Sequence, residues 1–133
     1  MKKFQKCIAI DFDGTITRAD NKTRGQELVL KKNAPEVIRQ LYSEGYLIII
    51  NTLRDGKEWE KEARDFLDKH DIPYHLFNEN DPSRIEYFGE SRKIAADIYI
   101  DDRNLLGIPD DWKDIYCIVK HTIGTPYTEE ELK

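Results

Sequence analysis

The chain has 133 residues, a formal net charge of −5, and 39% hydrophobic and 35% charged residues. This length predicts a single domain, residues 1–133, and the composition is typical of a soluble globular protein. No apolar run is long enough to cross a membrane, and the basic start leads into a strand rather than a signal peptide, so we expect a cytoplasmic protein. The negative net charge disfavours binding of nucleic acid over a broad electrostatic surface, but it still allows a local basic pocket.

Strands and helices are expected to alternate along the chain, which is typical of a parallel sheet with helical crossovers. The expected strands cover residues 6–11, 46–51, 74–77, 97–100 and 115–119. Two longer helices are expected to begin with capping boxes, at Asn33 with Glu36 and at Asp55 with Glu58, and a shorter helical stretch covers residues 85–88. Residues 17–32 are polar and without clear periodicity, which predicts a loop or small flap. The fold class is therefore α/β, a Rossmann-like three-layer sandwich around a mainly parallel five-stranded sheet.

The two cysteines, Cys7 and Cys117, fall in strands that we expect to be buried. Both are interpreted as small, reduced core residues without a disulfide or metal role. The three histidines lack the spacing of metal ligands and are expected to be structural or exposed.

The first expected strand ends in two carboxylates one residue apart, within the run Asp-Phe-Asp-Gly-Thr that begins at Asp11. A capping aspartate followed by an Asp-Gly turn would explain only one of these acids. The second expected strand ends near Thr52, and the fourth ends at Asp101 and Asp102. Because ligands bind beyond the carboxyl ends of parallel strands, we expect these side chains to share one crevice.

In chain order, these residues resemble the four motifs of the haloacid dehalogenase (HAD) superfamily, most of whose members are phosphohydrolases. The motifs are Asp11 with Asp13, Thr52, a basic residue before the fourth strand, and Asp101 with Asp102. The resemblance covers nearly the whole chain. Since residues 17–32 are too few for a folded cap and the region before the fourth strand is used by core elements, it implies a minimal, capless member.

Clustered carboxylates repel one another, by roughly 4 kcal/mol for two charges about 4 Å apart at an effective dielectric near 20. A cation among them relieves this repulsion, and oxygen ligands without His or Cys select Mg²⁺. The resemblance implies that Asp11 and Asp101 supply carboxylate oxygens and that Asp13 supplies its main-chain carbonyl. Whether Asp102 binds the metal directly or through water stays open.

The resemblance also implies a mechanism. Asp11 attacks phosphorus and forms an aspartyl-phosphate, while Asp13 first protonates the leaving oxygen and then deprotonates the hydrolytic water. The second aspartate favours phosphate transfer over halide displacement. Thr52 donates a hydrogen bond to the phosphoryl group, and Lys93 neutralises its charge.

Other basic residues leave alternatives open. Arg92 or Arg84 could fill the basic motif in place of Lys93. Arg54 and Arg103 flank the expected crevice and are candidates to bind the substrate, or else form surface salt bridges. Asn78, at the end of the third expected strand, is a weaker candidate.

The expected function is therefore Mg²⁺-dependent hydrolysis of a phosphomonoester whose identity the sequence does not give. A nucleic-acid end stays open as substrate but is disfavoured by the net charge, no membrane partner is expected, and an open site allows a homo-oligomer whose neighbour supplies a lid. The alternative is a phosphate-responsive regulatory or binding module with a HAD-like fold and little turnover. A two-component receiver is disfavoured because its phosphorylated aspartate ends the third strand, where this chain has an asparagine.

Overall fold

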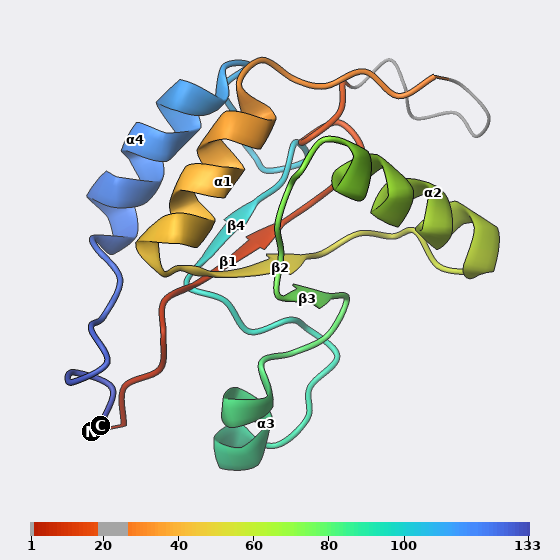
Figure 1. The fold of residues 1–133 in the computed structure, drawn as a ribbon. Coiled ribbons are helices and arrows are strands. Elements are labelled where there is room, and N and C mark those ends of the chain that lie inside the picture. The colour runs from red at the N-terminus through yellow and green to blue at the C-terminus, as the bar shows by residue number, and fades with distance from the viewer. Residues whose placement is uncertain (1, 19–26) are drawn as a thin grey trace.

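The structure, a computed structural model, describes residues 2–18 and 27–133. Its strands are β1 (Cys7–Ile10), β2 (Leu47–Ile50), β3 (Leu76–Phe77) and β4 (Ile98–Ile100), and its helices are α1 (Ala34–Glu44), α2 (Lys57–Lys69), α3 (Pro82–Phe88) and α4 (Trp112–Ile123). In the described part of the chain the strands form one four-stranded, all-parallel sheet in the order β3-β2-β1-β4 (Figure 1). The α/β class and the parallel sheet are as predicted, whereas the predicted fifth strand is wrong.

The two faces of the sheet differ in what covers them. Alternate residues of the central strands, such as Ile8 and Ile10 in β1, belong to the larger core, which also contains buried side chains of α1, α2 and α4. The intervening residues Cys7 and Ala9 belong to a smaller cluster with Ile94, which precedes β4. Since a strand points successive side chains to opposite faces, the three longer helices lie on one face of the sheet.

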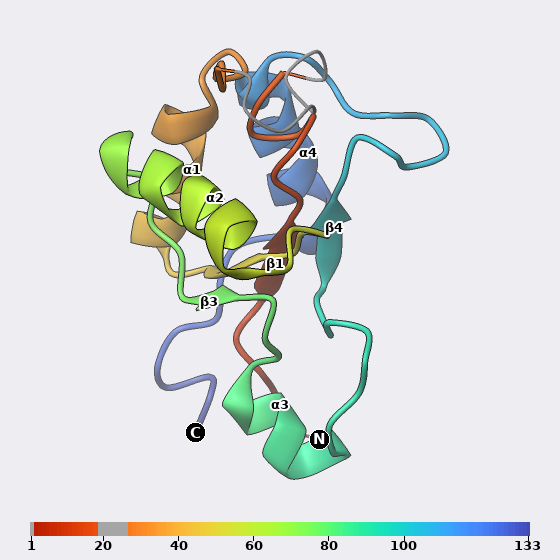
Figure 2. The ribbon, with the colours of Figure 1, turned by 90° about the vertical axis from the view of Figure 1, so that its right-hand side faces the viewer.

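The second face of the sheet has less helical cover than the first. This second face is covered by the segment that carries Ile94 and Ala96, and α3 lies below the sheet, away from α1, α2 and α4 (Figures 1 and 2). A helix of three or four turns on that second face is absent from the described part of the chain.

Residues 115–119, predicted as a strand, lie in the middle of α4. The buried residues of this helix are Trp112, Ile115 and Val119, a spacing of three and four residues, while Cys117 is exposed. This is the periodicity of a helix with one face against the core. The apolar run alone suggested a strand, and the prediction that Cys117 is buried is wrong, whereas Cys7 is fully buried.

The predicted helix starts are close, but their capping boxes are not formed. Asn33 precedes α1 without a side-chain cap, and its amide nitrogen instead donates to Asp111 Oδ1 at 2.9 Å. Gly56, rather than Asp55, precedes α2, again without a side-chain cap. The predicted short helical stretch is longer than expected, because Asp81 caps α3 by accepting from the backbone N–H of Ser83 at 3.1 Å.

The predicted flap, residues 17–32, is described only in part, because residues 19–26 lie outside the described residues. Its two ends form an antiparallel bridge between Thr17 and Leu30. The Lys31 N–H also donates to the Ile16 carbonyl at 2.8 Å. Among the described helices, none combines the length and the apolar character that a bilayer crossing requires.

Candidate metal centre and active site

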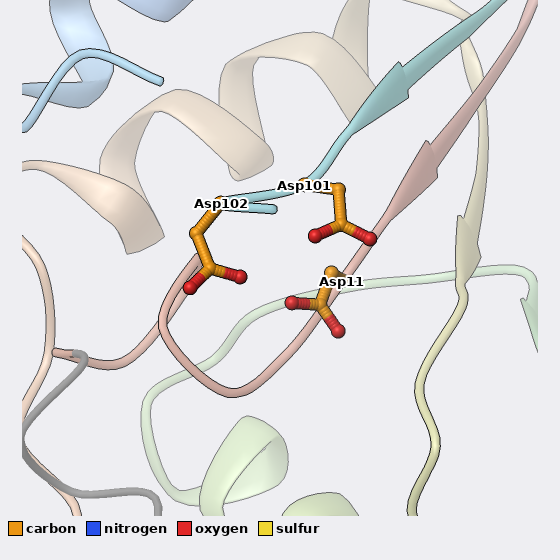
Figure 3. A group of neighbouring side chains, drawn as sticks. All are labelled: Asp11, Asp101 and Asp102. Carbon is orange, nitrogen blue, oxygen red and sulfur yellow. The ribbon is translucent and has the colours of Figure 1, made fainter. Parts of the chain in front are cut away.

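Three carboxylates meet where β1 and β4 end. Asp11 follows β1, and its N–H donates to the carbonyl of Ile100, the last residue of β4, at 2.9 Å. Asp101 and Asp102 follow β4 directly. One carboxylate oxygen from each of the three residues lies within 4.8 Å of the others, and Figure 3 shows the three side chains pointing toward one another. The structure thus brings together the acids that the sequence separates by about ninety positions.

The turn after β1 connects these acids. Thr15 is fully buried, and its hydroxyl donates to Asp11 Oδ2 at 3.1 Å while accepting from the Asp102 N–H at 3.0 Å. Gly14 has a φ of 82°, a left-handed conformation that favours glycine, so the chain can turn back at this point. The carbonyl of Thr15 accepts from the indole N–H of Trp112 at 2.9 Å, which ties the turn to α4.

The electrostatics of the centre favour a bound cation. Burial, followed by the nearby charge of Asp101, raises the pKa of Asp11 to about 7. Such a shift means that the ionised form of Asp11 is poorly compensated by the protein alone. Three carboxylates without His or Cys form a donor set that suits a hard divalent ion such as Mg²⁺, so the residues present fit the metal that the sequence predicts.

Asp13 is held by Arg54. The guanidinium donates from Nε to Asp13 Oδ2 and from Nη2 to Asp13 Oδ1, both at 2.8 Å, and its Nη1 donates to Glu62 at 2.6 Å. Only 1% of the Arg54 surface is exposed, and its guanidinium carbon lies 5.0 Å from the ring centre of Phe12. The interpretation of Arg54 as a substrate-binding residue therefore does not fit its placement, since its donors are directed to Asp13, Glu62 and the backbone.

A cavity of about 300 Å³ opens at this edge of the sheet. Its lining residues are Asp11, Asp13, Asn51, Thr52, Leu53, Trp59, Asp101 and Arg103. Thr52 is positioned by Asn78, the residue after β3, because the Thr52 N–H donates to Asn78 Oδ1 at 2.8 Å. The Thr52 hydroxyl oxygen accepts from the N–H of Arg54 at 3.2 Å. The hydroxyl hydrogen can therefore be donated to another acceptor. The cavity is therefore lined by a carboxylate, a hydroxyl and a cationic side chain, from Asp11, Thr52 and Arg103 respectively.

The basic residues that the sequence suggested for the site differ in whether they line the cavity. Arg103 lines the cavity, but Lys93 does not, and the Lys93 ammonium lies 4.9 Å from the centre of the Tyr99 ring. Arg92 lines a separate cavity beside α3, and Arg84 pairs with Asp97 at 2.9 Å at the opposite end of the sheet. None of the three candidates for the basic motif thus lies in the cavity, and a phosphate-binding role for Lys93 stays a prediction.

Several site residues received no role in the sequence reasoning. Thr15 stood within the recognised motif, so its position was available, but its two hydrogen bonds depend on the fold. Glu62 and Trp112 support Arg54 and Thr15, and nothing in the sequence marks either one, since Trp112 is 97 positions from its partner. Asn51, Leu53 and Trp59 join the lining, and only the first two could be inferred from their place after β2.

The fold and site define an α/β protein with a three-carboxylate centre at the carboxyl edge of a parallel sheet. The chain belongs to the same family as a conserved protein coded by a locus of Bacteroides thetaiotaomicron, to which it is 33% identical. That similarity covers 90% of this chain and 92% of the other, with a TM-score of 0.72.

A chain in the structure of the Pnkp1/Rnl/Hen1 RNA repair complex is similar in fold, with a TM-score of 0.54 and 15% identity. That similarity covers 95% of this chain but 43% of the other chain. No protein-family model and no curated protein sequence matches the chain.

Proposed function

We propose that this protein is a Mg²⁺-dependent phosphomonoester hydrolase of the HAD type, acting through an aspartyl-phosphate on Asp11. The observation that carries the proposal is the convergence of the Asp11, Asp101 and Asp102 carboxylates within 4.8 Å, beside a cavity that also exposes Thr52. A phosphoryl group needs positive charge and donors around its oxygens, and these residues supply both once a cation is bound.

In this proposal, Asp11, Asp101 and Asp102 would hold the Mg²⁺, together with the main-chain carbonyl of Asp13 that the resemblance implies. The metal supplies positive charge that offsets the repulsion between the carboxylates and the anionic phosphoryl group. Asp11 keeps one carboxylate oxygen for attack, and Thr15 fixes its orientation by donating to the Oδ2 atom at 3.1 Å. The main-chain N–H of Arg103 donates to Asp101 Oδ1 at 2.9 Å, and its exposed side chain provides a cation for the phosphoryl oxygens or a second anionic group.

The reaction has two steps. Asp11 attacks phosphorus while the bond to the leaving oxygen breaks and Asp13 gives its proton to that oxygen. Water then attacks phosphorus, the Asp11–phosphorus bond breaks, and Asp13 takes the proton of the water. Both Asp13 oxygens accept from Arg54 in the structure. The proposal therefore requires Asp13 to release at least one of these bonds and to take up a proton from solvent before the first step.

The pairing of Asp13 with Arg54 favours a second candidate function. If Asp13 stays held by Arg54, the phosphoryl-enzyme lacks a base for its hydrolysis and persists. The protein would then act as a phosphate-responsive module that phosphorylates on Asp11 and releases phosphate slowly.

The substrate panel follows from the open cavity. Leu53 and Trp59 offer apolar surface for a leaving group, and Arg103 suits a second anionic group. The RNA repair complex that shares the fold gives a reason to include oligonucleotides with 3′- or 5′-terminal phosphates. Phosphorylated metabolites, nucleotides and phosphopeptides complete the panel.

The direct test is turnover of p-nitrophenyl phosphate with Mg²⁺. Asp11→Asn is expected to abolish turnover, because the nucleophile and a metal ligand are lost together, and chelation of the metal should have the same effect. Asp110→Asn is the matched control, because the Asp110 side chain is exposed and contacts only Lys31 at 3.9 Å among the described residues.

Full activity of Asp11→Asn would contradict the proposed nucleophile. Stoichiometric labelling of Asp11 by a phosphoryl donor without release of phosphate would instead support the regulatory module.

A further inference from the structure

A second cavity, of about 530 Å³, lies at the end of the sheet where the strands begin. Its lining includes Lys2, Lys3, Lys6 and Arg84 together with the rings of Phe4 and Tyr127. Lys6 directly precedes β1, and its carbonyl accepts from the N–H of Leu47 at the start of β2. The cavity is therefore at the opposite edge from the three-carboxylate centre, in the region where Figure 1 shows both chain ends and α3.

The charge of this cavity is opposite to that of the whole chain. Arg84 pairs with Asp97 at 2.9 Å and donates to the Gln5 carbonyl at 3.2 Å, so it is fixed in the wall. Lys2, Lys3 and Lys6 form no salt bridge with the described residues, and their ammonium groups lie near aromatic rings, with Lys6 4.8 Å from the centre of Tyr127. Hydrogen bonds from Thr128, followed by the charges of Lys3 and Lys6, lower the pKa of Glu131, and Asp97 also lines the cavity. The four basic side chains outnumber these two carboxylates, so the cavity is locally positive on a chain whose net charge is −5.

Exposed aromatic side chains adjoin the cavity. The Phe4 ring contacts Tyr87 and Phe88, with ring centres 5.6 Å and 5.4 Å apart. Tyr87 is 61% exposed and Phe88 is 69% exposed. Both belong to α3, a short helix that contributes no buried residue to the core. Large aromatic side chains left in solvent beside cations are typical of surfaces that bind a ligand with flat rings.

We propose that this basic–aromatic surface, formed by the six cavity residues named above with Tyr87 and Phe88, binds a single-stranded segment of nucleic acid. The lysines contact backbone phosphates, and unpaired bases stack on Tyr87 and Phe88. An acidic peptide would use the cations but has few flat rings to place on the aromatics. A duplex would offer phosphates but keeps its base faces stacked inside, so the combination fits a single strand best.

The test is fluorescence anisotropy of a labelled oligothymidylate of about 12 nucleotides that carries no terminal phosphate, measured with chelator present. Such a strand has no phosphomonoester, so binding does not depend on the proposed hydrolase activity. We expect binding that weakens with salt by a slope of about −0.7 per phosphate contact. Lys2→Gln combined with Lys3→Gln should lower that slope, and Phe88→Ala should weaken binding by about tenfold.

Lys69→Gln combined with Lys113→Gln is the matched control, because both lysines are exposed and lie on other helices. This control and Asp11→Asn should bind the strand as the unchanged protein does. Tyr87→Ala provides a second stacking variant, and thermal melts establish that each variant is folded.

The proposal is overturned if the strand does not bind, or if binding is unaffected by both the lysine and the aromatic variants. It is also overturned if a duplex binds as tightly as the single strand. Competition by inorganic polyphosphate that is as strong as competition by the strand, and equal for Phe88→Ala and the unchanged protein, would show a site for polyanions without bases.

Discussion

Thr15 shows how single hydrogen bonds define the candidate centre. Its hydroxyl is fully buried and joins the end of β1 to the end of β4 through Asp11 and the N–H of Asp102. A buried donor or acceptor that loses its partner costs about 1–3 kcal/mol. The position of Thr15 therefore couples the geometry of two acids of the candidate metal centre to the stability of the turn after β1.

Arg54 is the residue on which the role of Asp13 depends. Arg54→Met is expected to lower the free energy of unfolding by about 3 kcal/mol, because Asp13 and Glu62 lose a buried cation that pairs with both. Arg54→Met combined with Glu62→Gln should recover part of this loss. Chemical denaturation measures both.

Lys61→Met is the control for Arg54→Met, because Lys61 also pairs with a carboxylate on the same helix but is exposed. It should leave stability unchanged. A loss of stability no larger for Arg54→Met than for Lys61→Met would show that the buried ion pairs do not hold Asp13.

At the scale of elements, α4 differs most from the sequence-based expectation. The run from Ile115 to Val119 is continuously apolar, and a short apolar run can be a buried strand or one part of a buried helix. The positions of Trp112 and Asp111 decide between them, since Trp112 continues the spacing of the buried face and Asp111 caps the helix by accepting from the Lys113 N–H at 2.9 Å. The hydrogen bond from the Trp112 indole to the Thr15 carbonyl then requires this helix to lie against the turn after β1.

The helical assignment makes the two cysteines distinguishable. Cys117 is exposed on α4, whereas Cys7 is fully buried in β1 and burial raises the pKa of its thiol to about 12. In the native protein a thiol reagent such as Ellman's is expected to modify one cysteine rapidly, and the second only after unfolding. Cys117→Ser should remove the fast reaction. Two equally slow thiols in the native protein would contradict the placement of Cys117 and favour the buried strand.

At the scale of the whole molecule, the carboxyl edge of the sheet gathers residues from β1, β2 and β4. The parallel direction of these strands could be predicted from the alternation of strands and helices, and the convergence of Asp11, Asp101 and Asp102 at one edge followed from it. The order of the strands in the sheet comes from the structure alone. The pairing of Asp13 with Arg54 could not, because a strand end fixes where a side chain starts but not which partner it meets. The same holds for Lys93, whose position before β4 gave no information on its direction.

The grouping of basic and aromatic residues at the opposite edge of the sheet was harder to predict from the sequence. Lys2, Lys3 and Lys6 are close in the chain, but Arg84 and Tyr127 reach them only because α3 and the C-terminal segment lie below the sheet. A net charge of −5 conceals this local reversal, so the overall composition was a poor guide to the charge of this edge.

The central claim is that three acids form one divalent-cation site, and calorimetric titration with Mg²⁺ tests it most directly. We expect one Mg²⁺ per chain at about pH 8, and roughly tenfold weaker binding one pH unit below the Asp11 pKa of about 7, because the ion requires the ionised carboxylate. Asp101→Asn should abolish this binding, while the exposed control Asp110→Asn should retain it. Equal Mg²⁺ affinity in Asp101→Asn and the unchanged protein would contradict the account.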